Sequence, residues 1–66
     1  MRILAFESSA KAASVALMED GVLLAESFQN NGKTHSATLM PMAEQVLRDC
    51  GLQAGDLDCV AVAKGP

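Results

Sequence analysis

Asp20 and Gly21 stand between two apolar runs, and this pair constrains the fold more than any other feature of the chain. A two-residue turn of type I′ needs positive φ at both central positions, which an Asp-Gly pair adopts readily. The runs on either side, residues 14–18 and 22–28, therefore predict an antiparallel hairpin. The second run becomes more polar over residues 27–29, which indicates a strand at the edge of its sheet.

A further strand is predicted at residues 3–6, where the apolar side chains are continuous. Continuous apolar runs are typical of central strands that are buried on both faces. Residues 8–12 are small and polar, so they predict a turn that joins this strand to the hairpin. Together these segments predict a three-stranded antiparallel meander.

A helix is predicted after the turn at residues 30–33. Thr34 or Ser36 can cap its start, and Gly51 is expected to end it just after Cys50. Pro41 removes one backbone donor about one turn in, so we expect it to bend the helix or to delay its regular start. Apolar residues recur at three- and four-residue spacing and predict one buried stripe. They are Leu39, Met40, Ala43, Val46, Leu47 and Cys50.

Residues 59–63 predict a fourth strand of the buried type, after an acidic connector at residues 52–58. A helix between the third and fourth strands lets the last strand join the first in parallel, by a right-handed crossover. The predicted fold class is therefore α/β, with a mixed sheet in the order 3-2-1-4 and no domain boundary within residues 1–66. Lys64-Gly65-Pro66 is typical of a strand-to-loop junction, so we expect the segment to be the first part of a larger domain.

The charge of the chain argues against direct nucleic-acid binding. The formal net charge is −3 and the five basic residues are scattered, whereas phosphate binding favours clustered Lys and Arg. No apolar run approaches the roughly 18 residues of a membrane span, and Glu7 interrupts the N-terminal apolar stretch too early for a signal peptide. We therefore expect a cytosolic protein without membrane contact, with Cys50 and Cys59 as reduced, buried thiols.

Glu7 is the candidate for chemistry, because it follows the first predicted strand. A carboxylate at a strand end can face a metal-bound phosphate, and the alternative is a solvated acid. Ser8 follows it in a turn without glycine, Ser8-Ser9-Ala10-Lys11-Ala12, whereas glycine lets backbone amides approach phosphate oxygens closely. We therefore expect Glu7 and Ser8 to form at most a degenerate nucleotide site, and we expect no cofactor.

Two positions in the predicted helix are candidates for a protein interface. His35 is the single histidine and has no neighbouring cluster of metal ligands in the sequence, so a local hydrogen bond or an interface contact is expected. Met40 and Met42 flank Pro41 and lie about 200° apart around a helix, so both cannot face the sheet. We expect Met42 on the exposed side, where a flexible thioether suits a protein contact.

Short motifs follow one another along the whole chain: Ile3-Leu4-Ala5-Phe6-Glu7-Ser8-Ser9, Ser14-Val15-Ala16-Leu17, Asp20-Gly21, Thr34-His35-Ser36, Leu39-Met40-Pro41-Met42, Asp56-Leu57-Asp58 and Gly65-Pro66. In this order they resemble the bacterial YeaZ/TsaB family, the accessory subunits of the machinery that makes threonylcarbamoyladenosine on tRNA. The resemblance implies an actin-like (ASKHA, ribonuclease H-like) fold. This segment would be most of the first lobe's sheet and its first helix.

The resemblance also implies a subunit that is not the catalyst. Members of the family pair with the catalytic TsaD subunit, largely through their first helices, and a TsaE ATPase joins the complex. The tRNA would then be reached only through the complex. Older names for such sequences refer to a glycoprotease, but no residue pattern here supports protease chemistry.

Carried over by position, the helix at residues 35–47 is implied to be the partner-binding element. In the family Asp is common at the position of Glu7 and Thr is usual at that of Ser8, so both positions depart from the pattern. The implied interface residues are His35, Leu39, Met42 and Val46.

Two other functions remain open on the sequence. The first is an active ATP-dependent phosphotransferase or ATPase of the same fold, with Glu7 on the metal. The second is a small structural domain that folds alone, which we consider disfavoured because the sheet would expose the edge of its fourth strand and one uncovered face. The choice between a heterodimer and a homodimer is also open.

Overall fold

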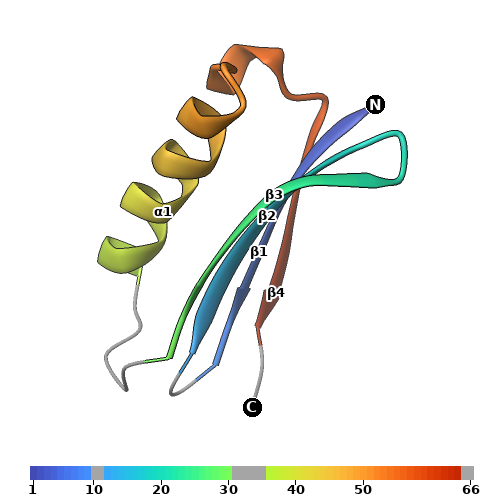
Figure 1. Cartoon of the computed structure of the whole chain (residues 1–66). Coiled ribbons are helices and arrows are strands. Elements are labelled where there is room, and N and C mark those ends of the chain that lie inside the picture. Colours follow the sequence, from blue (N-terminus) through green and yellow to red (C-terminus); the bar gives the residue numbers. More distant parts are fainter. Residues whose placement is uncertain (10–11, 31–35, 65–66) are drawn as a thin grey trace.

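The computed structural model describes residues 1–9, 12–30 and 36–64, and it has a single sheet with one long helix on one side (Figure 1). His35 and Thr34 therefore lie outside the described residues, as do Gly65 and Pro66. In chain order the elements are β1 (Arg2–Ser8), β2 (Ala13–Glu19), β3 (Val22–Gln29), α1 (Ser36–Asp49), the short 3-10 helix η1 (Ala54–Asp56) and β4 (Cys59–Lys64).

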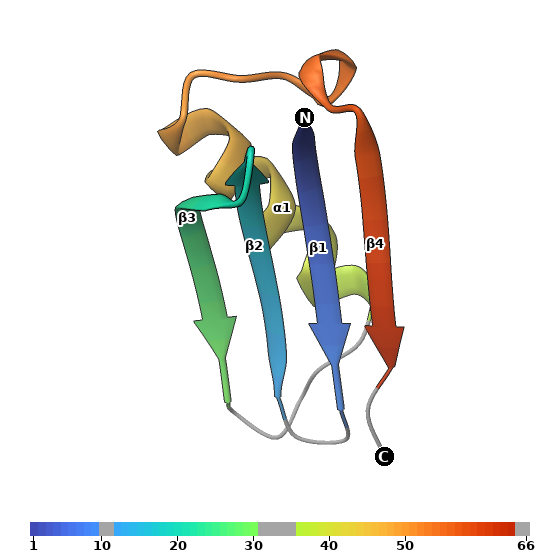
Figure 2. The same ribbon diagram turned by 90° about the vertical axis from the view of Figure 1, so that its right-hand side faces the viewer.

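The strand order confirms the predicted topology. The four strands follow one another as β3-β2-β1-β4, as Figure 2 shows from the side opposite α1. β1 pairs with β2 and β2 with β3 in antiparallel fashion, and β4 runs parallel to β1. The predicted edge position of β3 is likewise confirmed, and α1 forms the crossover that the parallel pair requires.

The hairpin between β2 and β3 turns at Asp20 and Gly21, as predicted. Both residues have positive φ, 51° and 83° respectively, which is the backbone that a type I′ turn requires. The pairing register shifts between Leu17 and Met18, which marks a β-bulge or irregularity just before the turn. The turn residues therefore account for the hairpin, because few other residue pairs adopt this backbone at low cost.

The C-terminus of α1 is closed by a Schellman motif around Gly51, which has φ of 69°. The Leu52 N–H donates to the Leu47 carbonyl at 2.9 Å, and the Gly51 N–H donates to the Arg48 carbonyl at 3.0 Å. These bonds satisfy two carbonyls that lack partners within the helix. Pro41 lies inside α1, which is continuous from Ser36 to Asp49. The predicted helix and its terminator are confirmed.

The core lies between α1 and the face of the sheet centred on β2, with Leu4 of β1 at its side. In β2 alternate side chains point toward the helix, which is the period of a strand buried on one face. The helix contributes residues at three- and four-residue spacing. The buried residues are Leu4, Ala13, Val15, Leu17, Met42, Ala43, Val46 and Leu47.

Two expectations about burial are wrong. β1 is buried on one face only, because Leu4 is its single fully buried residue and no element among the described residues covers the side opposite α1. β4 is exposed at residues 59–63 rather than buried, with Val60 at 55% and Val62 at 76% exposure. The reason is that α1 packs mainly against β2 and β3, so the apolar side chains of β4 receive no cover from it.

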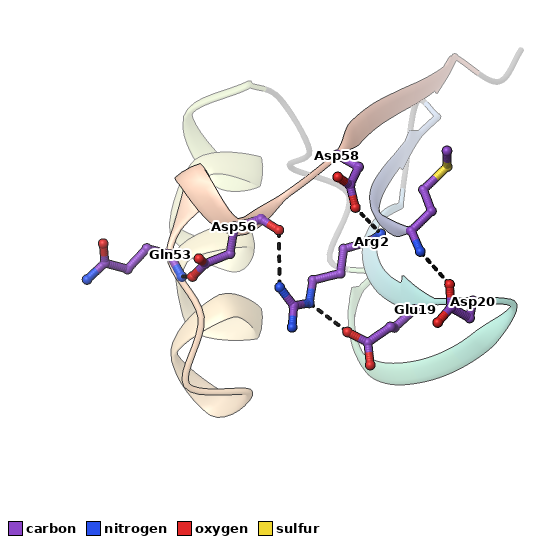
Figure 3. Close-up of polar contacts among 7 residues, drawn as sticks. Arg2, Glu19, Asp20, Gln53, Asp56 and Asp58 are labelled. Atoms are coloured by element: carbon purple, nitrogen blue, oxygen red, sulfur yellow. Dashed lines mark hydrogen bonds and ion pairs between the residues drawn. The ribbon is translucent and has the colours of Figure 1, made fainter.

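Arg2 joins the start of β1 to the segment that leads into β4 (Figure 3). Its Nε donates to Glu19 Oε1 at 2.6 Å, and its guanidinium also donates to the Asp56 carbonyl at 3.4 Å. Its backbone N–H donates to Asp58 Oδ2 at 2.8 Å, while the Asp58 N–H donates to the Arg2 carbonyl at 2.9 Å. This group of bonds places the connector at one end of the sheet and starts the parallel pairing of β4.

No helix in the described part of the chain is long and apolar enough to cross a membrane.

Candidate functional site

Glu7 lies near the end of β1, between the two neighbours of that strand. Its Cα partners are Ser14 on β2 and Ala63 on β4, and its side chain is exposed. Side chains alternate along a strand, and Leu4 faces α1, so Glu7 belongs to the opposite, open face of the sheet. Figure 2 looks onto this face.

Ser8 belongs to the other face. It follows Glu7 in the same strand and pairs with Ala13, which is buried on the helix side. The two residues proposed from the sequence as a degenerate nucleotide site are therefore adjacent along the chain, but the alternation of the strand sends their side chains to opposite sides. The structure does not bring them together.

The open face holds a shallow depression of about 250 Å³ beside Glu7. Its floor consists of alanines from three strands, with polar side chains at Glu7, Ser14 and Glu26. The alanines that line it are Ala5, Ala16, Ala61 and Ala63. Because these side chains are so small, an incoming group could approach the sheet backbone closely.

The depression offers two carboxylates and no cation among the residues that line it. Mg²⁺ is commonly held by one or two carboxylates together with substrate phosphates, and Glu7 could supply one such ligand. Among residues 1–9, 12–30 and 36–64, no three or more His, Cys, Asp or Glu side chains are grouped closely enough to hold a metal by themselves.

Polar groups in the turn between β1 and β2 form hydrogen bonds with one another. The Ser9 N–H donates to the Ala12 carbonyl at 2.8 Å, and the Ala12 N–H donates to Ser9 Oγ at 3.3 Å. These two amides are thus engaged within the turn, whereas a phosphate cradle needs amides that point at the ligand. Residues 10 and 11 lie outside the described part of the chain.

The outward face of α1 is the second candidate site. Met40 is 57% exposed there, next to exposed Pro41, and the exposed residues that follow in the described part of the helix are polar or charged: Glu44, Gln45, Arg48 and Asp49. On it the Gln45 side-chain amide donates to Asp49 Oδ1 at 2.8 Å. An apolar side chain beside charged groups is a common composition for a protein contact.

The expected position of Met42 is wrong. Met42 is only 5% exposed and Val46 only 2%, and both pack into the core; Leu39 is half-buried against the same cluster. Met40, assigned to the buried stripe from the sequence, is the exposed methionine instead. The apolar positions 39, 42, 43, 46, 47 and 50 follow the i, i+3, i+4 pattern without a break, and this spacing could have identified Met42 as the buried one.

The two cysteines are both free, as expected, but they differ in exposure. Cys50 at the end of α1 is half-buried. Cys59 is exposed, so the expectation of a buried thiol is wrong for this residue. The cause is that Cys59 pairs with Ile3 and so lies on the face of the sheet opposite α1, which no described element covers.

Comparison with known proteins shows that this chain is similar to proteins named for the modification of tRNA. The family model described as "TsaD: tRNA N6-adenosine threonylcarbamoyltransferase" matches residues 22–66. The chain is 36% identical over its whole length to the tRNA threonylcarbamoyladenosine biosynthesis protein TsaB of Bacillus subtilis, and it covers 29% of that protein. The corresponding protein of Escherichia coli is 35% identical over the whole chain, which covers 28% of it.

Transferases of the same family are more distant. The tRNA N6-adenosine threonylcarbamoyltransferase of Mus musculus is 29% identical over 77 residues, with 97% of this chain and 23% of that protein covered.

The solved structure of YeaZ from Pseudomonas aeruginosa superimposes with a TM-score of 0.83 at 31% identity, covering 98% of this chain and 30% of that one. The chain spans less than a third of the length of the TsaB proteins and of the YeaZ structure that it matches. The predicted fold class, a mixed sheet of the actin-like type, is thereby confirmed. The chain belongs to the TsaD family. Within this family it corresponds to the N-terminal part of a protein of the YeaZ/TsaB type.

Proposed function

We propose that the protein acts in the biosynthesis of threonylcarbamoyladenosine on tRNA, as a partner subunit and not as the catalyst. The observation that carries this proposal is the match of the whole chain to two TsaB proteins at 35–36% identity. The solved YeaZ structure supports it at the level of the backbone. The catalyst would be a TsaD-type subunit in a cytoplasmic complex.

The non-catalytic role is supported by the geometry around Glu7. A nucleotide site at this strand end would need groups that converge on one phosphate, but Glu7 and Ser8 belong to opposite faces of the sheet. The adjoining turn also engages the Ser9 and Ala12 amides in its own hydrogen bonds. These features favour a protein that acts through contacts with other subunits.

The outward face of α1 is the surface that we propose for the TsaD-type subunit. Met40 is its exposed apolar residue, and it takes the place that the sequence assigned to Met42. Three residues, Leu39, Met42 and Val46, would contribute indirectly, because they hold α1 against the sheet. His35, which lies outside the described residues, remains a proposed contact. A TsaE-type ATPase would join this pair, and tRNA would be bound by the complex as a whole.

The pathway and the pairing can be tested separately. The gene, expressed in full, is introduced into bacteria depleted of their own TsaB, and the modified nucleoside is measured by mass spectrometry of digested tRNA. Restoration of the nucleoside is expected, and its complete absence despite soluble expression would contradict a role in the pathway.

Pairing is tested by size-exclusion chromatography of the purified protein with a TsaD-type subunit. Co-elution is expected. If the two proteins elute separately with ATP, with ADP and without nucleotide, the partner role fails. Elution of the protein alone as a dimer would show that a homodimer competes with the heterodimer.

The alternative function is an ATP-dependent phosphotransferase, favoured by the position of Glu7 on the rim of the depression. Titration of ATP and Mg²⁺ by calorimetry separates the two functions. A phosphotransferase should bind ATP in a way that Glu7→Gln abolishes and Glu26→Gln, on the other side of the same depression, does not. The partner role predicts the same weak or absent binding in all three proteins.

A further inference from the structure

We draw no further inference here: the strongest candidate, the open face of the sheet around the alanine-floored depression between Glu7 and Glu26, carries nothing because nothing in the structure shows what covers it.

Discussion

Two leucines of the same hairpin have opposite environments. Leu17 on β2 is fully buried, whereas Leu23 on β3 is 52% exposed. Removing a buried leucine side chain loses its transfer free energy and leaves a cavity, so Leu17→Ala should lower the free energy of unfolding by about 2–5 kcal/mol. Leu23→Ala is the matched control and should cost less than about 1 kcal/mol. Urea denaturation of the protein measures both values, and equal losses would contradict this core.

Gly21 and Gly55 differ in backbone conformation, but both have open space where a Cβ atom would be added. A Cβ added at either residue would meet no atom within 4 Å, yet Gly21 has φ of +83° and Gly55 lies outside the left-handed region. Gly21→Ala should therefore destabilise the protein by about 1–2 kcal/mol through backbone strain alone. Gly55→Ala should be neutral or stabilising by less than about 1 kcal/mol. Thermal unfolding of the two variants tests this, and a Gly21→Ala protein as stable as the parent would contradict the turn type.

Asp20 and the amino group of Met1 form an exposed ion pair. The hydrogen bond between them lowers the pKa of Asp20 and raises that of the amino group. The carboxylate's contribution is present above its unfolded pKa of about 3.9 and is lost as the pH falls through the lower folded pKa. The amine's contribution is present below its unfolded pKa of about 7.7–8.0 and is lost as the pH rises through the higher folded pKa.

The stabilisation by this pair should therefore be greatest between about pH 4 and pH 8. Asp20→Asn keeps a residue that tolerates positive φ but removes the charge, so the difference in unfolding free energy from the parent should shrink as the pH falls below about 4 and as it rises above about 8. Because both groups are exposed, the difference should also shrink in high salt. Chemical denaturation across pH and salt measures it, with the Met1 amino group left free. A difference that does not change with pH would mean that the pair has no influence on stability.

The burial and direction of single side chains were the hardest features to predict from the sequence. The prediction of a type I′ turn at Asp20 and Gly21 was correct, because the requirement for positive φ at these two residues is local. The assignment of Met40 and Met42 was wrong, since it used the angle between them but not the phase of the whole stripe. That Glu7 and Ser8 diverge follows from strand alternation, but it required knowing that β1 extends through Ser8.

The helix α1 carries the prediction for the interface. Met40→Glu places a charge on its outward face, and burying an unpaired charge is costly, so we expect co-elution with the TsaD-type subunit to be lost or its Kd to rise at least about tenfold, equal to about 1.4 kcal/mol. Leu23→Glu, at a similar exposure of 52% against 57%, is the control on β3.

Calorimetry of the two complexes measures the dissociation constants, and circular dichroism checks that both variants fold. Equal binding by the two variants would place the interface away from this part of α1. Loss of binding by Leu23→Glu alone would move the interface to the β3 edge.

Elements defined by local chemistry were predicted well. Gly51 ends α1 because it adopts positive φ in a Schellman motif, and the apolar period of the helix is a property of its own residues. The burial of β4 was predicted wrongly because it depends on which strands α1 covers. That choice is made by packing between elements distant in sequence, and an apolar run alone does not report it.

At the scale of the whole molecule, the face of the sheet opposite α1 has no cover within the described residues, and α1 also leaves the β4 part of the other face uncovered. Val60 and Val62 are exposed on β4, and β4 is also an edge strand with free backbone groups. Such edges readily pair with other chains, so a polypeptide limited to residues 1–66 should self-associate. Sedimentation velocity across a concentration series should show species larger than a monomer, and Val62→Lys should reduce them.

Cooperative unfolding of residues 1–66 as a monomer at every concentration would contradict this expectation, and it would favour the small structural domain that the sequence left open. The topology itself was predictable from the sequence, because a meander followed by a helix leaves few ways to place a fourth strand.

The parallel pairing of β1 with β4 has a consequence for synthesis of the protein on the ribosome. Ile3 pairs with Cys59, so an early residue of this segment can complete its pairing only after one of the last residues of the segment has been translated. At about 5–20 residues per second, the hairpin strands emerge seconds before β4 does. During that interval the nascent chain exposes one flank of β1, and chaperones that bind extended apolar segments would find it there.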